Sequence, residues 1–246
     1  MSDVLQRRVW VEQIMGMPVS VHLRGACPAG RPSFVDDLFA ELRELDLLFS
    51  TYRPESQISR IADGVLDRED CDPVVTEVLE LCASATVLTG GWFDVMLPTP
   101  DGRRLDPSGL VKGWAVERVA TRLGERWKGD YYVNAGGDIA LSSPSGEPWR
   151  IGVENPVTGG LLAVVPLTSG GIATSGTAHR GEHIFDPTTG RPATALRSVT
   201  VIGPSLMWAD VLATAAFARG HGASNWVSRH EGYRAVVLSD DGTVST

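Results

Sequence analysis

The stretch Tyr131-Tyr132-Val133-Asn134-Ala135-Gly136-Gly137-Asp138 decides the class of fold. Its first three residues predict a short buried strand, and the run that follows them predicts a glycine turn. Residues 149–203 predict more strands, with turns at Asn155-Pro156, Gly159-Gly160, Gly170-Gly171 and Gly190-Arg191-Pro192. Because no regular alternation of strand and helix joins these segments, the pattern favours an α+β fold with mixed or antiparallel sheets over a doubly wound one.

Segments with helical spacing of apolar residues lie on both sides of this strand-rich region. Helices are predicted over residues 33–48 with Ser33 as the cap, and over residues 73–89, 109–126, 206–219 and 222–230. Gly90-Gly91 suits a left-handed helix end. Residues 8–23 predict two strands around Met15-Gly16-Met17-Pro18, and residues 235–238 a last strand. Residues 51–60, and those after Trp92-Phe93-Asp94, predict loops. With no repeat or linker, we expect one compact, two-lobed domain over residues 1–246.

Composition limits the partners and the compartment. The chain has 246 residues, is 43% hydrophobic and carries a net charge of −8. An acidic protein lacks the basic surface of a general nucleic-acid binder, although a cation or backbone N–H groups can still hold a phosphate. Cys27, Cys71 and Cys82 have the spacing of neither a disulfide framework nor a zinc site. No run approaches about 20 apolar residues, and the N-terminus has no secretory pattern, so we expect a cytoplasmic protein without a membrane span.

Asp210 and Thr214 form the first candidate site. They are four residues apart on a predicted helix and therefore share one face. The helix is apolar all round, so Asp210 is expected to be buried, and a buried carboxylate needs an ion or a partner. Carboxylate and hydroxyl oxygens suit Mg²⁺. An ion pair of Asp210 with an arginine, or a loop cap, is the alternative.

His183 leads into the turn Asp186-Pro187-Thr188-Thr189-Gly190. On this rigid frame the imidazole suits a general base or a phosphate donor, although a lone histidine is more often structural. His22, His179, His221 and His230 have no such frame, and we interpret them as structural or surface residues.

Three glycine-containing stretches are candidate anion sites. Residues 170–177 and 135–138 place small residues where backbone N–H groups can approach an anion, or form plain turns. Residues 109–114 place Lys112 at a predicted helix start, where an anion is favoured. The sequence has no P-loop, Gly-x-Gly-x-x-Gly or Gly-x-Ser-x-Gly motif, so a nucleotide site would have another design.

In this order, these motifs resemble the FAD:protein FMN transferase (ApbE-type) family from about residue 10 to about residue 220. The matching stretches are Met15-Gly16, Ser50-Thr51-Tyr52 to Ser56, Ile58-Ser59-Arg60, Gly91-Trp92-Phe93-Asp94, residues 105–116, residues 133–139, residues 149–153, Ile172-Ala173-Thr174-Ser175-Gly176, residues 183–190, residues 198–202, Ala209-Asp210 and Thr214.

The resemblance implies a reaction and its site. Members of the family bind FAD with Mg²⁺ and transfer FMN to a Thr or Ser hydroxyl of an acceptor protein, releasing AMP; some relatives hydrolyse FAD to FMN and AMP. A non-catalytic FAD-binding protein is the third interpretation. The resemblance assigns catalysis to His183 and the metal to Asp210, Thr214 and the main-chain oxygen of Gly109, with Ala213 as a further carbonyl. It assigns the FAD site to Met15, Tyr52, Trp92, Phe93, Asp94, Asp106, Lys112 and Phe185.

Three departures from the family pattern bear on the acceptor. Only residues 177–182 separate the Thr174-Ser175-Gly176 stretch from His183, residues 93–98 differ from the usual form, and the insert before Leu105 is short. We expect a more open mouth to the site. Many relatives are exported lipoproteins, whereas this sequence shows neither a signal nor a lipid-attachment cysteine, so a cytoplasmic acceptor is expected.

Overall fold

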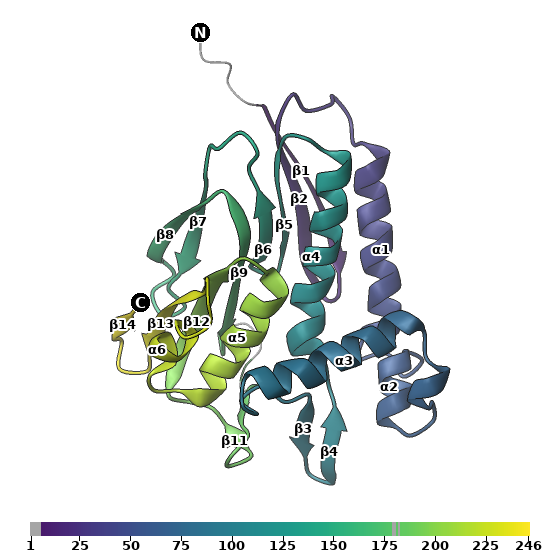
Figure 1. Ribbon diagram of the computed structural model, residues 1–246, viewed down its shortest axis with the longest axis vertical. Coiled ribbons are helices and arrows are strands. Elements are labelled where there is room, and N and C mark those ends of the chain that lie inside the picture. The colour runs from purple at the N-terminus through teal and green to yellow at the C-terminus, as the bar shows by residue number, and fades with distance from the viewer. Residues whose placement is uncertain (1–5, 179–180, 182) are drawn as a thin grey trace.

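A computed structural model describes residues 6–178, 181 and 183–246. An eight-stranded sheet forms its centre, as Figure 1 shows. The strand order is β1-β2-β5-β6-β9-β12-β13-β14, and each neighbouring pair is antiparallel. These strands are β1 (Gln6–Ile14), β2 (Met17–Gly25), β5 (Asp130–Ala135), β6 (Asp138–Ser142), β9 (Ser169–Gly176), β12 (Leu196–Gly203), β13 (Arg234–Ser239) and β14 (Val244–Ser245). The predicted α+β class with antiparallel sheets is confirmed.

Three separate hairpins and six α-helices complete the described part of the chain. The hairpins pair β3 (Met96–Thr99) with β4 (Gly102–Leu105), β7 (Trp149–Glu154) with β8 (Leu161–Leu167), and β10 (Phe185–Asp186) with β11 (Arg191–Pro192). The helices are α1 (Ser33–Phe49), α2 (Gln57–Ala62), α3 (Pro73–Leu88), α4 (Ser108–Arg126), α5 (Leu206–Arg219) and α6 (Ala223–Val227), with a 3₁₀ turn at Arg68–Asp70.

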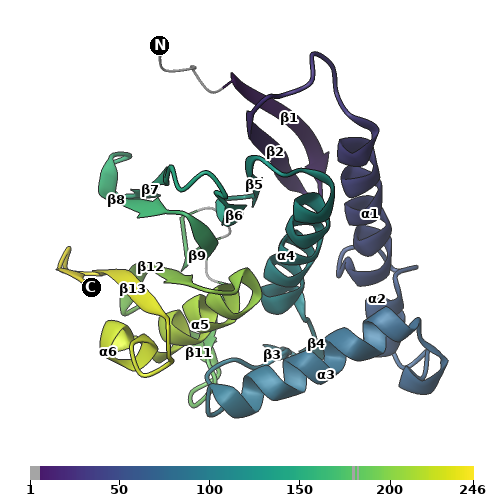
Figure 2. The ribbon, with the colours of Figure 1, turned by 45° about the horizontal axis from the view of Figure 1, so that its top comes forward.

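The sheet buries a different set of apolar residues on each face. Alternate residues of a strand point to opposite faces, so Ala140 and Ala173 face the helices whereas Ile139, Leu141 and Ile172 face β7 and β8. Figure 2 shows α5 below β9 and β12, with β7 and β8 on the opposite side. The helix side holds the larger core, and the hairpin side is left partly open for a site.

Helix α5 is the most deeply buried helix because its sequence has no polar face. It packs against α4, β9 and β12, and Ala209, Val211, Ala215 and Phe217 are fully buried. An all-apolar helix is stable only inside a protein. Any carboxylate on α5 is thereby carried into the interior.

The structure corrects four local predictions. Ser33 is the first residue of α1 and makes no capping bond. Residues 51–60 include α2, which Ser56 caps by accepting a hydrogen bond from the backbone N–H of Ser59. The segment after Asp94 forms the β3–β4 hairpin. Gly170-Gly171 is no turn but part of β9, where a Cβ would collide with Gly203 or Leu206.

Candidate active site

A cavity of about 1030 Å³ opens beside the hairpin side of the sheet. Its walls come from the β1–β2 turn, the segment after α3, the start of α4, the β5–β6 turn, β7, β9, the segment around β10, and α5. It brings together eleven of the twelve predicted site residues, namely Met15, Trp92, Phe93, Asp94, Asp106, Gly109, Lys112, His183, Phe185, Asp210 and Thr214. The residues thus converge from distant parts of the chain; the roles assigned to them remain predictions.

Asp210 lies where α5 packs against Gly113 of α4. It is 2% exposed, as its place on an apolar helix predicts. The backbone N–H of Gly113 donates a hydrogen bond to Oδ2 of Asp210 at 3.1 Å. A Cβ at Gly113 would lie 2.8 Å from the Cβ of Asp210, so the missing side chain allows this approach.

Thr214 lies one turn after Asp210 and faces the same cavity. Its hydroxyl is 3.2 Å from the hydroxyl of Ser175 on β9, and a Cβ at Gly109 would lie 3.7 Å from it. Hard oxygen donors therefore lie close together here. They are the carboxylate of Asp210, the hydroxyl of Thr214 and the backbone of Gly109.

This donor set suits Mg²⁺ better than a softer metal. Mg²⁺ is commonly held by one or two carboxylates together with substrate phosphates. Within residues 6–178, 181 and 183–246, no group of three or more His, Cys, Asp or Glu side chains is placed to hold a metal.

Lys112 lies between two carboxylates. Its Nζ is 2.5 Å from Oδ2 of Asp138 and 3.8 Å from Oδ1 of Asp210. Oδ1 of Asp138 accepts a hydrogen bond from the backbone N–H of Thr174 at 3.0 Å. Since the Asp138 side chain is only 1% exposed, the ammonium is joined to a carboxylate fixed inside the sheet.

His183 precedes β10 and is partly buried. Its Nδ1 is 2.9 Å from the carbonyl oxygen of Gly181. A carbonyl oxygen only accepts hydrogen bonds, so Nδ1 donates in this contact and Nε2 carries the lone pair of the neutral ring. Nε2 is therefore the basic nitrogen.

Trp92 and Phe93 form an aromatic part of the cavity wall. Phe93 is 2% exposed, and its backbone N–H donates to the hydroxyl of Thr89 at 3.0 Å. The guanidinium of Arg219 lies 5.6 Å from the centroid of the Trp92 ring, within the range of a cation–π contact.

Asp94 and Asp106 already accept hydrogen bonds from nearby groups. Asp94 accepts from the backbone N–H of Met96 at 2.8 Å and forms an ion pair with Arg103. Asp106 accepts from the backbone N–H of Ser108 at 2.9 Å, at the first turn of α4. Both carboxylates therefore help to fix the cavity wall.

Met15 lies in the two-residue β1–β2 turn with φ of +54°, and Gly16 follows with φ of +72°. Two positive values match the hairpin turn whose twist suits the flanking strands. A left-handed conformation costs a methionine roughly 1–2 kcal/mol. The hairpin thus keeps a strained residue whose side chain lines the cavity.

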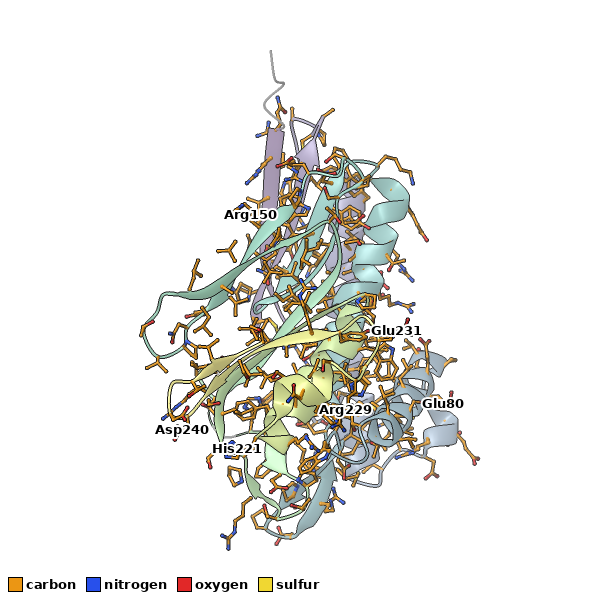
Figure 3. The ribbon with its side chains drawn as sticks, turned by 60° about the vertical axis from the view of Figure 1, so that its left-hand side comes forward. Glu80, Arg150, His221, Arg229, Glu231 and Asp240 are labelled. Atoms are coloured by element: carbon orange, nitrogen blue, oxygen red, sulfur yellow. The ribbon has the colours of Figure 1, made fainter. Side chains whose placement is uncertain are left out.

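Tyr52 is the predicted site residue that the structure does not bring to the cavity. Its side chain is 85% exposed between α1 and α2, so the geometry gives no support to its predicted contact with FAD. His221 is exposed near the C-terminal elements (Figure 3), whereas His230 is partly buried and its Nδ1 is 3.2 Å from the carbonyl oxygen of Val227. His179 lies outside the described residues.

The cavity also contains residues to which the sequence assigns no role. Ser198 on β12 is 4% exposed, and its hydroxyl has no hydrogen-bond partner among the described residues. His22 on β2 stacks on Tyr132 with ring centroids 3.9 Å apart, and burial lowers the pKa of His22 to about 4. The only sign of these residues in the sequence is the alternation of polar and apolar residues along a strand. Because a sheet face exposed to solvent shows the same alternation, the sequence could not identify them as cavity residues.

Solved structures define the fold class as that of the ApbE flavin transferases. The chain is similar over 98% of its length to the ApbE protein of Thermotoga maritima, with a TM-score of 0.86, 21% identity and 96% of that chain covered. The flavin transferase ApbE of Vibrio cholerae matches with a TM-score of 0.77 and 24% identity over 98% of each chain.

The ApbE family pattern matches residues 15–100 and 96–237, and the chain belongs to this family. The FAD:protein FMN transferase of Haemophilus influenzae is 32% identical over 157 residues, which cover 57% of this chain and 45% of the relative. That of Rhodobacter capsulatus is 30% identical over 184 residues, which cover 70% of this chain and 35% of the relative. The chain spans about half the length of the curated relatives it matches.

Proposed function

We propose that this protein is a Mg²⁺-dependent FAD:protein FMN transferase that moves FMN from FAD to a Thr or Ser hydroxyl of an acceptor protein and releases AMP. The observation that carries the proposal is the convergence of Asp210, Thr214, Lys112 and His183 on one cavity. The names of the curated relatives support the same reaction.

The cavity has the size and lining for a dinucleotide. Its volume of about 1030 Å³ is at the upper end of the roughly 300–1,000 Å³ typical of ligand pockets. Trp92 and Phe185 offer aromatic surface for the ring systems, and the buried Phe93 supports the wall behind them. Lys112, near the start of α4, offers positive charge for the phosphates.

Asp210, Thr214 and the Gly109 carbonyl would hold the Mg²⁺ ion. When bound there, the ion would neutralise charge on the phosphate oxygens of FAD. Lys112 adds a fixed positive charge beside the same oxygens. The chain's own residues therefore bind and orient the pyrophosphate.

His183 acts on the proton of the acceptor. Nε2 accepts the proton of the Thr or Ser hydroxyl as its oxygen forms a bond to the phosphorus of the FMN half. The bond from that phosphorus to the oxygen of the AMP half breaks, and the bonding electron pair leaves with AMP. The products are a phosphoester-linked flavin, AMP and a proton on His183.

The cytoplasm is the proposed compartment. The three cysteines are unpaired, which is typical of proteins in a reducing environment. No helix among residues 6–178, 181 and 183–246 combines the length and the apolar composition needed to cross a bilayer.

Nucleotide analysis tests the reaction. The protein is incubated with FAD and Mg²⁺, with or without EDTA and with or without a candidate acceptor domain. The proposal expects AMP release that requires both metal and acceptor, with flavin retained on the denatured acceptor. AMP and free FMN without an acceptor would instead establish an FAD pyrophosphatase. Bound FAD with no AMP under any condition would establish a binding protein.

A further inference from the structure

Lys112, Asp138 and Asp210 form a charge cluster across three elements. The ammonium of Lys112 on α4 is 2.5 Å from Asp138 at the start of β6 and 3.8 Å from Asp210 on α5. Asp138 and Asp210 are 1% and 2% exposed. At these distances in a buried site, each carboxylate attracts the ammonium strongly.

The ammonium of Lys112 and a divalent ion compete for Asp210. Both are cations drawn to the same carboxylate, and a lysine side chain has a flexible stem that can follow the stronger attraction. An ammonium in direct contact with Asp210 would occupy one of its oxygens and repel an incoming ion. A metal site next to Lys112 therefore needs a group that holds the ammonium away.

We propose that Asp138 is a positioning residue that holds Lys112 away from Asp210 and so keeps Asp210 available to a divalent ion. This inference rests on the metal site of the proposed function. The backbone N–H of Thr174 donates to Oδ1 of Asp138, so the carboxylate cannot follow the lysine. The shorter distance from Nζ to Asp138 than to Asp210 is the arrangement that the proposal requires.

The net charge of the cluster would also change sign when a divalent ion binds. The side chains of Lys112, Asp138 and Asp210 carry one net negative charge together, and a bound divalent ion makes the sum one net positive charge. The cluster thus attracts the ion first and a pyrophosphate afterwards. The negative charge of Asp138 contributes to this order of binding, in which the ion precedes the pyrophosphate, although Asp138 does not line the cavity itself.

The test measures Mn²⁺ binding to the FAD-free protein by electron paramagnetic resonance. Asp138→Asn keeps an oxygen for the Thr174 N–H but removes the charge that holds Lys112. A unit charge at this range changes the proton affinity of a carboxylate by about tenfold or more, so we expect the Kd for Mn²⁺ to rise by at least about tenfold. Asp63→Asn is the matched control, since it removes a carboxylate that pairs with Arg104 outside the cavity.

A second variant distinguishes a positioning role of Asp138 from a folding defect caused by Asp138→Asn. Adding Lys112→Met to Asp138→Asn removes the competing ammonium and should return the Kd for Mn²⁺ to within a few-fold of the wild-type value. An unchanged Kd in Asp138→Asn overturns the proposal. A Kd that stays raised in the double variant also overturns it, because that is the result of a folding defect.

The outcomes distinguish this inference from the proposed function. Weakened Mn²⁺ binding in Asp138→Asn with restoration in the double variant supports the inference even if the wild-type protein releases no AMP from FAD. Absence of Mn²⁺ binding to the wild-type protein, or binding that Asp210→Asn leaves unchanged, overturns the metal site and this inference together.

Discussion

At the scale of the residue, the carbonyl of Gly181 decides which nitrogen of His183 is basic. The contact of 2.9 Å with the carbonyl oxygen of Gly181 places a ring proton on Nδ1, so Nε2 is the nitrogen that can take up a further proton. The backbone beside the histidine thus sets its chemistry.

Replacing His183 with glutamine should abolish transfer and preserve FAD binding. Glutamine has no titrating nitrogen, and loss of a general base typically costs about 10²–10⁴ in rate. AMP release and acceptor-bound flavin fluorescence measure transfer, and fluorescence titration measures FAD binding. His221→Gln is the matched control at an exposed histidine; undiminished transfer in His183→Gln would rule out the assignment.

His22 should make stability depend on pH. Burial lowers its pKa from 6.5 to about 4, so the unfolded chain takes up a proton near pH 6.5 and the folded protein only near pH 4. Between these values the unfolded state holds more protons, and acidification therefore favours unfolding. We expect Tm to fall from pH 6.5 to pH 4 and to fall less steeply in His22→Gln. Equal slopes in both proteins would contradict this.

Sequence motifs identify cavity residues well where several unusual residues occur together. The Asp210–Thr214 spacing and the frame around His183 were visible because a carboxylate in an apolar helix and a histidine before a rigid turn stand out. Asp138 was predicted only as part of the candidate anion site at residues 135–138, and Ser198 only as part of the family match at residues 198–202, since their surroundings depend on Lys112 and Gly176 from other elements. Tyr52 shows the reverse case, because its motif matches the family while its side chain faces solvent.

At the scale of the element, the contact between α4 and α5 determines the position of Asp210 and thus the geometry of the proposed metal site. Gly113 lets the two helices approach until its backbone N–H reaches Asp210. The second turn of α4 and the second turn of α5 therefore move together, and a change in the spacing of the helices moves Asp210 relative to Lys112.

Gly113→Ala should destabilise the protein and weaken divalent-ion binding. The added methyl would lie 2.8 Å from the Cβ of Asp210 and 3.1 Å from the carbonyl oxygen of Leu206, and overpacking of this kind costs about 1–3 kcal/mol. For a domain of this size each kcal/mol lowers Tm by about 2–4 °C. Thermal unfolding and Mn²⁺ binding measure the two effects.

Gly30→Ala provides the control, because no atom lies within 4 Å of the added Cβ and φ is not positive. An unchanged Tm in Gly113→Ala would contradict the prediction, because it would show that α4 and α5 can move apart without loss of stability.

The length and the apolar pattern of each element explain whether the sequence predicts it. Helices α1, α3, α4 and α5 have long apolar patterns and were predicted within a few residues. Helix α2 and the β3–β4 hairpin are too short to show a clear apolar pattern, and they are held in place by the burial of Ile58 and Leu105 in the rest of the chain. Tertiary packing supplies the information that local patterns lack.

At the scale of the whole molecule, the cavity is lined by residues of the sheet, of its hairpins and of the helices. We expect FAD to raise Tm, since a ligand at 100 times its Kd stabilises the folded state by about 2.7 kcal/mol. The shift should grow when Mg²⁺ is present and shrink with EDTA. AMP alone is the control, and a Tm that does not respond to FAD would contradict a dinucleotide site in this cavity.

The residues that line the cavity extend along the chain from Val9 to Thr214. The cavity can therefore form only late in the synthesis of the chain. A ribosome adds about 5–20 residues each second, so the first wall segment emerges many seconds before the last. During that interval the nascent chain lacks the later wall segments, and the cavity is incomplete. Binding of the proposed flavin nucleotide is therefore expected only after translation of the chain through Thr214.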